Sequence, residues 1–176
     1  MPNISKYESI LRDLENGAYA TLGLSIGSVE EVTPGTKIAK KDTQSTPTIS
    51  SPAGLSEGNY YTVISLDIDA PYTSWNALSP IMHWIQTDFQ MSESSSRLRS
   101  DDELPVVPWL PAGPPPGAAP HRYIFLLYAQ TPGSAIPPGL KGKSIRRLQR
   151  MRFDVDGMVE KLGLGEIVAV NYFVCN

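Results

Sequence analysis

Hydrophobic residues along the chain recur mostly with the period of two that is typical of β-strands. The segments expected to form strands are 21–27, 59–66, 81–87, 122–130 and 167–174. In the first segment Leu22, Leu24 and Ile26 share one face. The segment 122–130 is almost continuously apolar, which predicts burial on both faces and a central place in the sheet.

Two segments have helical spacing instead. Ser5 and Glu8 have the spacing of a capping box, and apolar residues then recur at helical intervals until Gly17, so residues 1–18 should form an N-terminal helix. A second helical segment is expected over 144–163. There Ser144 would cap a basic helix and Asp154 would cap a further turn that ends at Gly163 or Gly165. The arginines of the basic helix, Arg146, Arg147, Arg150 and Arg152, are expected to form a solvated face.

The remaining segments are predicted to be turns and connections. Residues 33–58 are rich in Pro, Gly, Ser and Thr and should hold only brief strands. The polar run 88–102 should be an exposed connection, and Trp109 should anchor the proline-rich loop around it. We therefore expect residues 1–176 to form one mainly β domain, a sandwich of antiparallel sheets with short peripheral helices.

The composition excludes several classes of function. Hydrophobic residues make up 41% of the 176 residues and charged residues 19%, and the net charge is −3. This balance is globular and lacks the basic field that nucleic-acid binding needs. No apolar run reaches the ~20 residues of a transmembrane helix and the start lacks an apolar leader, so a cytoplasmic protein is expected. The single cysteine, Cys175, excludes an internal disulfide and a cysteine-rich zinc site.

Both histidines lie beside unusual loops. His121 follows a loop rich in glycine and proline, and His83 follows the loop that begins at Asp67 and Asp69. We hypothesise one pocket lined by Asp67, His83 and His121, because a carboxylate near a histidine favours the charged imidazole and suits an anionic ligand or proton transfer. Each histidine alone is also compatible with a structural role in the core, and an aspartate before a turn often binds only backbone N–H groups.

Other chemistries fit the sequence less well. No phosphate-binding Gly-x-x-x-x-Gly-Lys-Ser/Thr loop and no Gly-x-Ser-x-Gly elbow occurs. The histidines and aspartates match no metal-site spacing, so we predict neither a metal nor a cofactor. A buried pair of Asp69 and Arg122 would join the two loops structurally.

At these residues the sequence resembles the phosphatidylethanolamine-binding protein family, in a fungal-type form. The family's first signature, Asp-Pro-Asp-Ala-Pro and a later His-Trp, is similar to residues 67–71 and 83–84, and its second is similar to residues 113–123. The resemblance implies a β-sandwich with a pocket for phosphate, acetate or a phospholipid headgroup. It implies a cis Ala70–Pro71 bond and structural support from Asp69, Arg122 and Trp84. By motif match the pocket walls would be Asp67, Pro71, His83, Gly113, His121 and Tyr123.

The sequence also departs from the family pattern. Ile68 replaces the usual proline of the first signature and should place an apolar side chain near the pocket. The chain stops just after its last strand, without the C-terminal helix that edges the pocket in animal members. The kinase regulation known for animal members therefore transfers poorly.

Three functions follow as hypotheses. The first is binding of a small anionic ligand, such as a phosphate ester, a phospholipid headgroup or a carboxylate. The second is an enzyme or accessory factor of fungal polyketide biosynthesis, in which His121, His83 and Asp67 act by acid–base chemistry on a carboxylated or anhydride intermediate. Ile68, Tyr72 and Trp75 would then face a polyketide chain. The third is a protease or kinase inhibitor or a scaffold that uses surface loops.

Overall fold

The computed structural model contains strands and helices in most of the expected segments, but the strand expected over 21–27 is divided in two at Leu22. It describes residues 4–52, 54–56, 58–92, 95–100, 104–131, 136–137, 139–142 and 145–176. The helices are α1 (Ile4–Glu15), the 3-10 helix η1 (Lys40–Thr43), α2 (Arg147–Arg150) and α3 (Val155–Lys161). The strands are β1 (Ala20–Thr21), β2 (Gly23–Ser25), β3 (Thr36–Lys37), β4 (Thr48–Ser50), β5 (Tyr61–Asp67), β6 (Ile81–Ser92), β7 (Ser95–Ser100), β8 (His121–Gln130) and β9 (Leu164–Cys175).

The strands form one continuous path and not the two separate sheets that were predicted. Their order is β1-β9-β8-β5-β6-β7-β4-β2, with β3 paired to β9. The two ends of this path, β1 and β2, are separated in sequence by Leu22 alone, so the sheet nearly closes into a barrel. Most neighbours are antiparallel, but β1 and β3 both pair with β9 in parallel. The mainly β class with peripheral helices is confirmed, and the sandwich is corrected to a barrel-like sheet.

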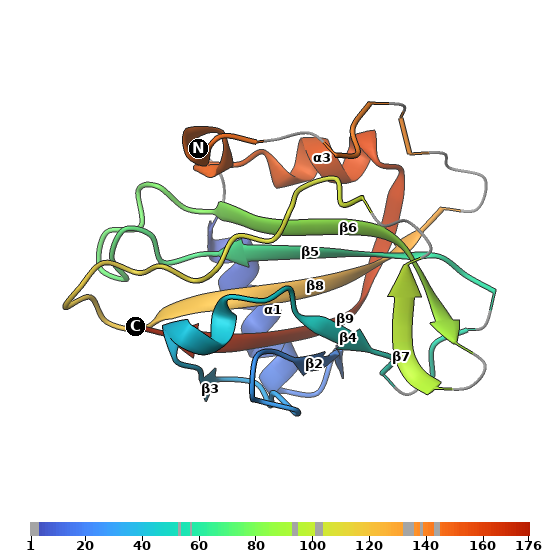
Figure 1. Cartoon of the computed structure of the whole chain (residues 1–176), viewed down its shortest axis with the longest axis horizontal. Coiled ribbons are helices and arrows are strands. Elements are labelled where there is room, and N and C mark those ends of the chain that lie inside the picture. The colour runs from blue at the N-terminus through green and yellow to red at the C-terminus, as the bar shows by residue number, and fades with distance from the viewer. Residues whose placement is uncertain are drawn as a thin grey trace.

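The two faces of the sheet carry different cores. Alternate residues of β5, such as Val63, face an inner core that also holds Leu24 of β2 and Ile49 of β4. The intervening residues, such as Ile64, face an outer core shared with α1 and α3. Figure 1 shows β2 and β4 in front of the sheet and α1 behind it. Strand β8 lies between β5 and β9 and is buried along most of its length, which confirms the central position predicted from its apolarity.

The polar segment 88–102 was interpreted wrongly as an exposed connection. Strand β6 continues to Ser92 and β7 returns beside it, with Phe89 opposite Ser100 and Gln90 opposite Arg99. Phe89 and Leu98 are buried whereas Arg97 and Arg99 are exposed. A strand with one solvated face needs only every second residue to be apolar, so its sequence is polar on average.

The second helical segment is only partly as predicted. Asp154 caps α3 by accepting a hydrogen bond from the Gly157 N–H, and Gly163 ends that helix with a left-handed φ of 62°. The proposed cap Ser144 lies outside the described residues. In the part of the chain that is described, no helix has the length and apolarity needed to cross a membrane.

Candidate functional site

A small pocket lies at the end of the sheet where β5 stops and β6 begins. Its volume is about 130 Å³. The 71–80 loop and the loop before β8 lie at this same end of the sheet (Figure 1). The pocket is lined by Asp67, Ile81, His83, Leu110, Pro111, Gly113, Tyr123, Arg147 and Met151.

Asp67 and His121 form a buried pair beside the pocket. The Nδ1 of His121 lies 2.9 Å from Oδ2 of Asp67, and its Nε2 lies 3.1 Å from the carbonyl oxygen of Pro71. Both partners accept hydrogen bonds, so an imidazolium satisfies both nitrogens. Burial lowers the pKa of His121, but the hydrogen bond and charge of Asp67 outweigh burial and hold this pKa above its ordinary value.

His83 has the opposite electrostatic character. Its Nδ1 lies 2.6 Å from the carbonyl oxygen of Leu110, and its ring packs edge-on against Tyr123. Complete burial lowers the pKa of His83, and the nearby charge of Asp67 only partly offsets this effect. Of the two histidines, His83 is therefore neutral near neutral pH, whereas His121 favours the charged form.

Tyr123 brings an unsatisfied hydroxyl to the pocket. The residue is fully buried, and its Oη makes no hydrogen bond of good geometry within the described residues, although the Asp67 carboxylate and the Gly113 backbone lie near enough to affect its pKa. Burial and the charge of Asp67 raise the pKa of Tyr123 above its usual range, so the hydroxyl keeps its proton. A buried hydroxyl without a partner is costly, and a ligand in the pocket could supply the missing hydrogen bond.

Asp69 and Arg122 join the two loops as the sequence suggests. The Asp69 side chain is inaccessible to solvent and accepts hydrogen bonds from Nε, Nη2 and the backbone N–H of Arg122, at 2.7–2.8 Å. This bidentate pair fixes the start of β8 against the end of β5. It thereby sets the position of the neighbouring Asp67 and His121.

The proline-rich loop before β8 is held at several points. Trp109 donates from Nε1 to the carbonyl of Thr43, and the hydroxyl of Thr43 accepts from the backbone N–H of Ala112. Trp109 also packs edge-on against Trp84 in the core. The pocket wall from Leu110 to Gly113 is therefore fixed without a ligand.

The structure brings together four of the six residues that the family resemblance placed in the pocket wall. Asp67, His83, Gly113 and Tyr123 line the pocket. Pro71 and His121 are absent from this lining, because the Pro71 carbonyl binds His121 and His121 is itself 1% exposed. His121 thus lies behind Asp67 and acts on the pocket through it.

One further expectation about the site, that for Ile68, fails. Ile68 is fully buried in the outer core beside α1, because consecutive residues of an extended chain point to opposite faces and Asp67 takes the pocket side. Ile68 therefore contributes nothing to the pocket. Tyr72 and Trp75 are 46% and 64% exposed and do not line the pocket, and their contact with a polyketide chain stays a prediction.

Sequence reasoning missed two arginines of α2. Arg147 lines the pocket, and Arg150 is only 6% exposed and donates to the carbonyls of Met82, His83 and Pro108. The prediction of a solvated basic face is therefore wrong for Arg150 and incomplete for Arg147. The mixed polar and apolar pattern of 144–152 carries no signal that separates these arginines from Arg146.

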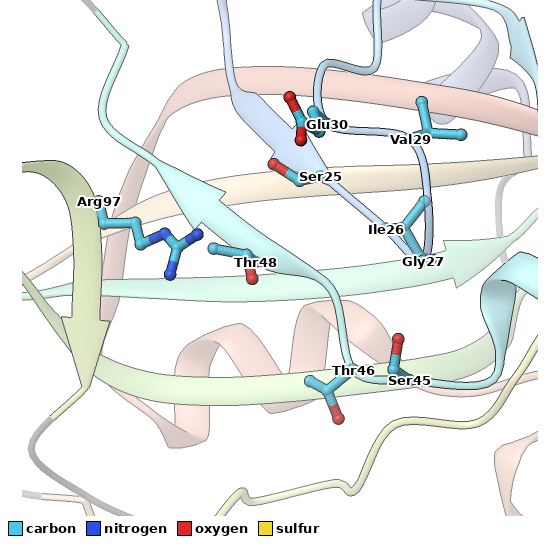
Figure 2. A pocket seen from close by; sticks show the side chains of 9 residues that line it. All are labelled: Ser25, Ile26, Gly27, Val29, Glu30, Ser45, Thr46, Thr48 and Arg97. Carbon is cyan, nitrogen blue, oxygen red and sulfur yellow. The ribbon is translucent and has the colours of Figure 1, made fainter.

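A larger hollow lies on the outer side of β2, β4 and β7. Its volume is about 480 Å³, and Figure 2 shows Arg97 of β7 reaching toward Thr48 of β4. Its lining is rich in hydroxyls, from Ser25, Ser45, Thr46 and Thr48. None of the predicted site residues and none of the unpartnered buried atoms found in the described chain belongs to it. The histidine pocket is therefore the candidate site.

The fold and the site together define a class: a mainly β protein with a small polar pocket at one end of a barrel-like sheet. The family model of the phosphatidylethanolamine-binding proteins matches residues 28–173. The chain belongs to this family, as the resemblance of its motifs indicated.

Individual relatives agree with this assignment. Phomoidride biosynthesis cluster protein N of Talaromyces stipitatus is 30% identical over 115 residues, which cover 64% of this chain and 56% of that protein. Its similarity supports the fungal-type resemblance. The chain spans about half the length of several curated relatives that it matches, with 56% and 41% for two of them.

Solved structures share the fold. Carboxypeptidase Y inhibitor, in its complex with the cognate proteinase, has a TM-score of 0.70 and 20% identity, with 98% of this chain and 93% of that chain covered. A phosphatidylethanolamine-binding protein from Plasmodium vivax has a TM-score of 0.70 and 17% identity, with 94% and 96% covered. At these identities the likeness concerns the fold alone.

Proposed function

We propose that the chain binds a small anionic ligand in the pocket between Asp67, His83 and Arg147. The ligand would be a phosphate ester, a phospholipid headgroup or a carboxylate. The observation that carries the proposal is the buried Tyr123 hydroxyl, which lines the pocket and has no partner among the described residues. Family membership supports the same reading.

The charges around the pocket fit an anion. The guanidinium of Arg147 is positive at neutral pH and lies in the pocket lining. The negative charge of Asp67 is compensated by the imidazolium of His121, 2.9 Å away. An incoming anion would meet one uncompensated cation, a hydroxyl donor and the backbone of Gly113.

Calorimetry with phosphoethanolamine and with acetate tests this proposal. The variant Tyr123→Phe should bind about 5- to 15-fold more weakly, which corresponds to one lost hydrogen bond of about 1–1.5 kcal/mol. Tyr60→Phe is the matched control, since Tyr60 is 45% exposed and does not line the pocket. Equal affinities of wild type and Tyr123→Phe for both ligands would remove the main support for the proposal.

A second function, a step in natural-product biosynthesis, is favoured by one specific observation. The Talaromyces relative is named as a biosynthesis cluster protein. In this chain a neutral His83 could take an acidic proton next to a carbonyl group while Arg147 holds a carboxylate of the substrate. Incubation with carboxylated or anhydride intermediates of the host's polyketide pathway tests it. Product formation that His83→Gln leaves unchanged would contradict this function.

We do not extend inhibition of a proteinase to this chain. The structural likeness to carboxypeptidase Y inhibitor is at 20% identity and concerns the fold. The cytoplasmic location expected from the sequence stays a prediction.

A further inference from the structure

The protonation of His83 is fixed by one backbone contact. A carbonyl oxygen can only accept, so Nδ1 of His83 must carry the proton that it shares with Leu110 at 2.6 Å. A second hydrogen bond joins the same two residues, in which the Leu110 N–H donates to the carbonyl of His83 at 2.8 Å. In the neutral imidazole Nε2 is then an acceptor with a free lone pair.

The surroundings of His83 favour this neutral form. The titratable or charged groups that face it are Asp67 of β5, His121 and Tyr123 of β8, and Arg147 and Arg150 of α2. Burial, Arg150 and His121 lower the pKa of His83, and Asp67 and the Leu110 carbonyl raise it, with a net lowering. Among the described residues the one hydrogen bond of the His83 ring is that of Nδ1, so Nε2 has no partner there, and the residue lines the pocket.

Arg147 supplies the complementary group. It is exposed and lines the pocket, and it forms neither an ion pair nor a hydrogen bond with another described residue. Its neighbour Arg150 is committed to three backbone carbonyls and cannot turn to a ligand without losing them. The pocket thus combines one available cation with one available lone pair.

We propose that the pocket selects oxyacids that still carry a proton, with the ligand's O–H donating to Nε2 of His83 and its charged oxygen binding Arg147. This inference rests on the proposed function and narrows it to a ligand class: hydrogen phosphate, the monoanions of phosphate monoesters, and half-ionised dicarboxylic acids. A fully ionised oxyanion would place a lone pair against the lone pair of Nε2. It would also lie close to the carboxylate of Asp67, whose two oxygens already accept from His121 and the Asp69 N–H.

Phosphate and sulfate separate this inference from simple anion binding. The two ions have similar size and shape, but near neutral pH phosphate carries at least one proton and sulfate carries none. Calorimetry at about pH 7 and constant ionic strength should give phosphate an affinity at least about 10-fold higher than that of sulfate. Acidification, which protonates Nε2, should shrink this ratio in the unmodified protein.

Variants of α2 and of His83 assign the roles. Arg147→Met should weaken phosphate about 10-fold, whereas Arg146→Met, one residue outside the pocket lining, should leave it unchanged. The amide of His83→Gln can donate to a ligand oxygen as well as accept from a ligand O–H, so this variant should bring the phosphate-to-sulfate ratio toward one. The acidification series gives the same information without a variant if His83→Gln does not fold.

The outcomes are distinct. Phosphate and sulfate binding with equal affinity at about pH 7 would overturn the selection of protonated acids and leave the proposed anion site intact. Binding of neither ion, nor of phosphoethanolamine, would overturn the proposed function and this inference with it. A phosphate affinity that is the same in Arg147→Met as in Arg146→Met would overturn the role of Arg147.

Discussion

His121 and Asp67 form a buried ion pair in which Nδ1 lies 2.9 Å from Oδ2, and both side chains are at most 5% exposed. Asp67 lines the pocket, whereas His121 stands behind it and is absent from the lining. It keeps Asp67 in place and cancels most of its charge toward a ligand. Two histidines that look equivalent in the sequence therefore have different roles.

The ion pair should make stability depend on pH. The folded-state pKa of His121 is raised above its ordinary value of 6.5, mainly by Asp67 acting against burial. Its contribution is thus fully present below about pH 6.5 and is lost as the pH rises through the folded-state pKa. In denaturation series from pH 6 to pH 9, His121→Asn should lack the fall in unfolding free energy that the wild type shows. Parallel curves for the two proteins would contradict the ion pair.

The pair of Asp69 and Arg122 should matter more to stability than any exposed pair. Asp69→Asn leaves the Arg122 guanidinium without its bidentate partner and should lower the unfolding free energy by about 3 kcal/mol. Lys6→Ala is the control, because the pair of Lys6 with Asp156 is exposed and should be worth less than about 1 kcal/mol. Urea denaturation of both variants measures the difference. A similar loss in the two would mean that Asp69 is not a structural tie.

The two arginines of α2 should separate stability from binding. Arg150→Met removes the hydrogen bonds of the guanidinium to three backbone carbonyls, of which that of His83 still accepts from the Leu110 N–H, and should cost at least about 2 kcal/mol. Arg147→Met should change the unfolding free energy by less than about 0.5 kcal/mol. Thermal and urea unfolding decide this. Equal destabilisation by both substitutions would show that Arg147 and Arg150 do not differ in their contribution to stability.

Much of the fold could be predicted from the sequence, because burial of a strand on one or both faces produces a recognisable pattern of apolar residues. The apolar run of β8 gave its central position, and the spacing of Leu22, Leu24 and Ile26 gave a buried face. Hairpin β6–β7 was missed because its outer face is polar. Closure of the sheet depends on the contact of residues 20–21 with β9, which no local pattern contains.

The site was predicted in part for a similar reason. Motifs identify which residues are special, so Asp67, His83, Gly113 and Tyr123 were found. They do not say whether a histidine that binds Asp67 lies on the pocket side or the far side of its carboxylate, so His121 was placed in the lining. Arg147 approaches from α2, far along the chain, and only the tertiary structure brings it to the pocket.

The Tyr123 hydroxyl should lower the stability of the free protein. Because this buried group has no partner, Tyr123→Phe should raise the unfolding free energy by about 1 kcal/mol while it weakens ligand binding. Tyr61→Phe is the opposite case, since the Tyr61 hydroxyl donates to the Ser56 carbonyl and its loss should lower stability by about 1 kcal/mol. Chemical denaturation without ligand measures both. A destabilised Tyr123→Phe would mean that the hydroxyl has a partner in the free protein.

The most direct measurement of the central claim is an NMR titration of the imidazole nitrogens with phosphoethanolamine. Nε2 of His83 and the amide of Gly113 should shift together and saturate at one ligand concentration, since both residues line the pocket. The nitrogens of His121, already bound to Asp67 and Pro71, should move less, and the amides of Ser25 and Thr48 in the outer hollow should not move. A His83 resonance that stays fixed while other residues show saturable shifts would contradict the account.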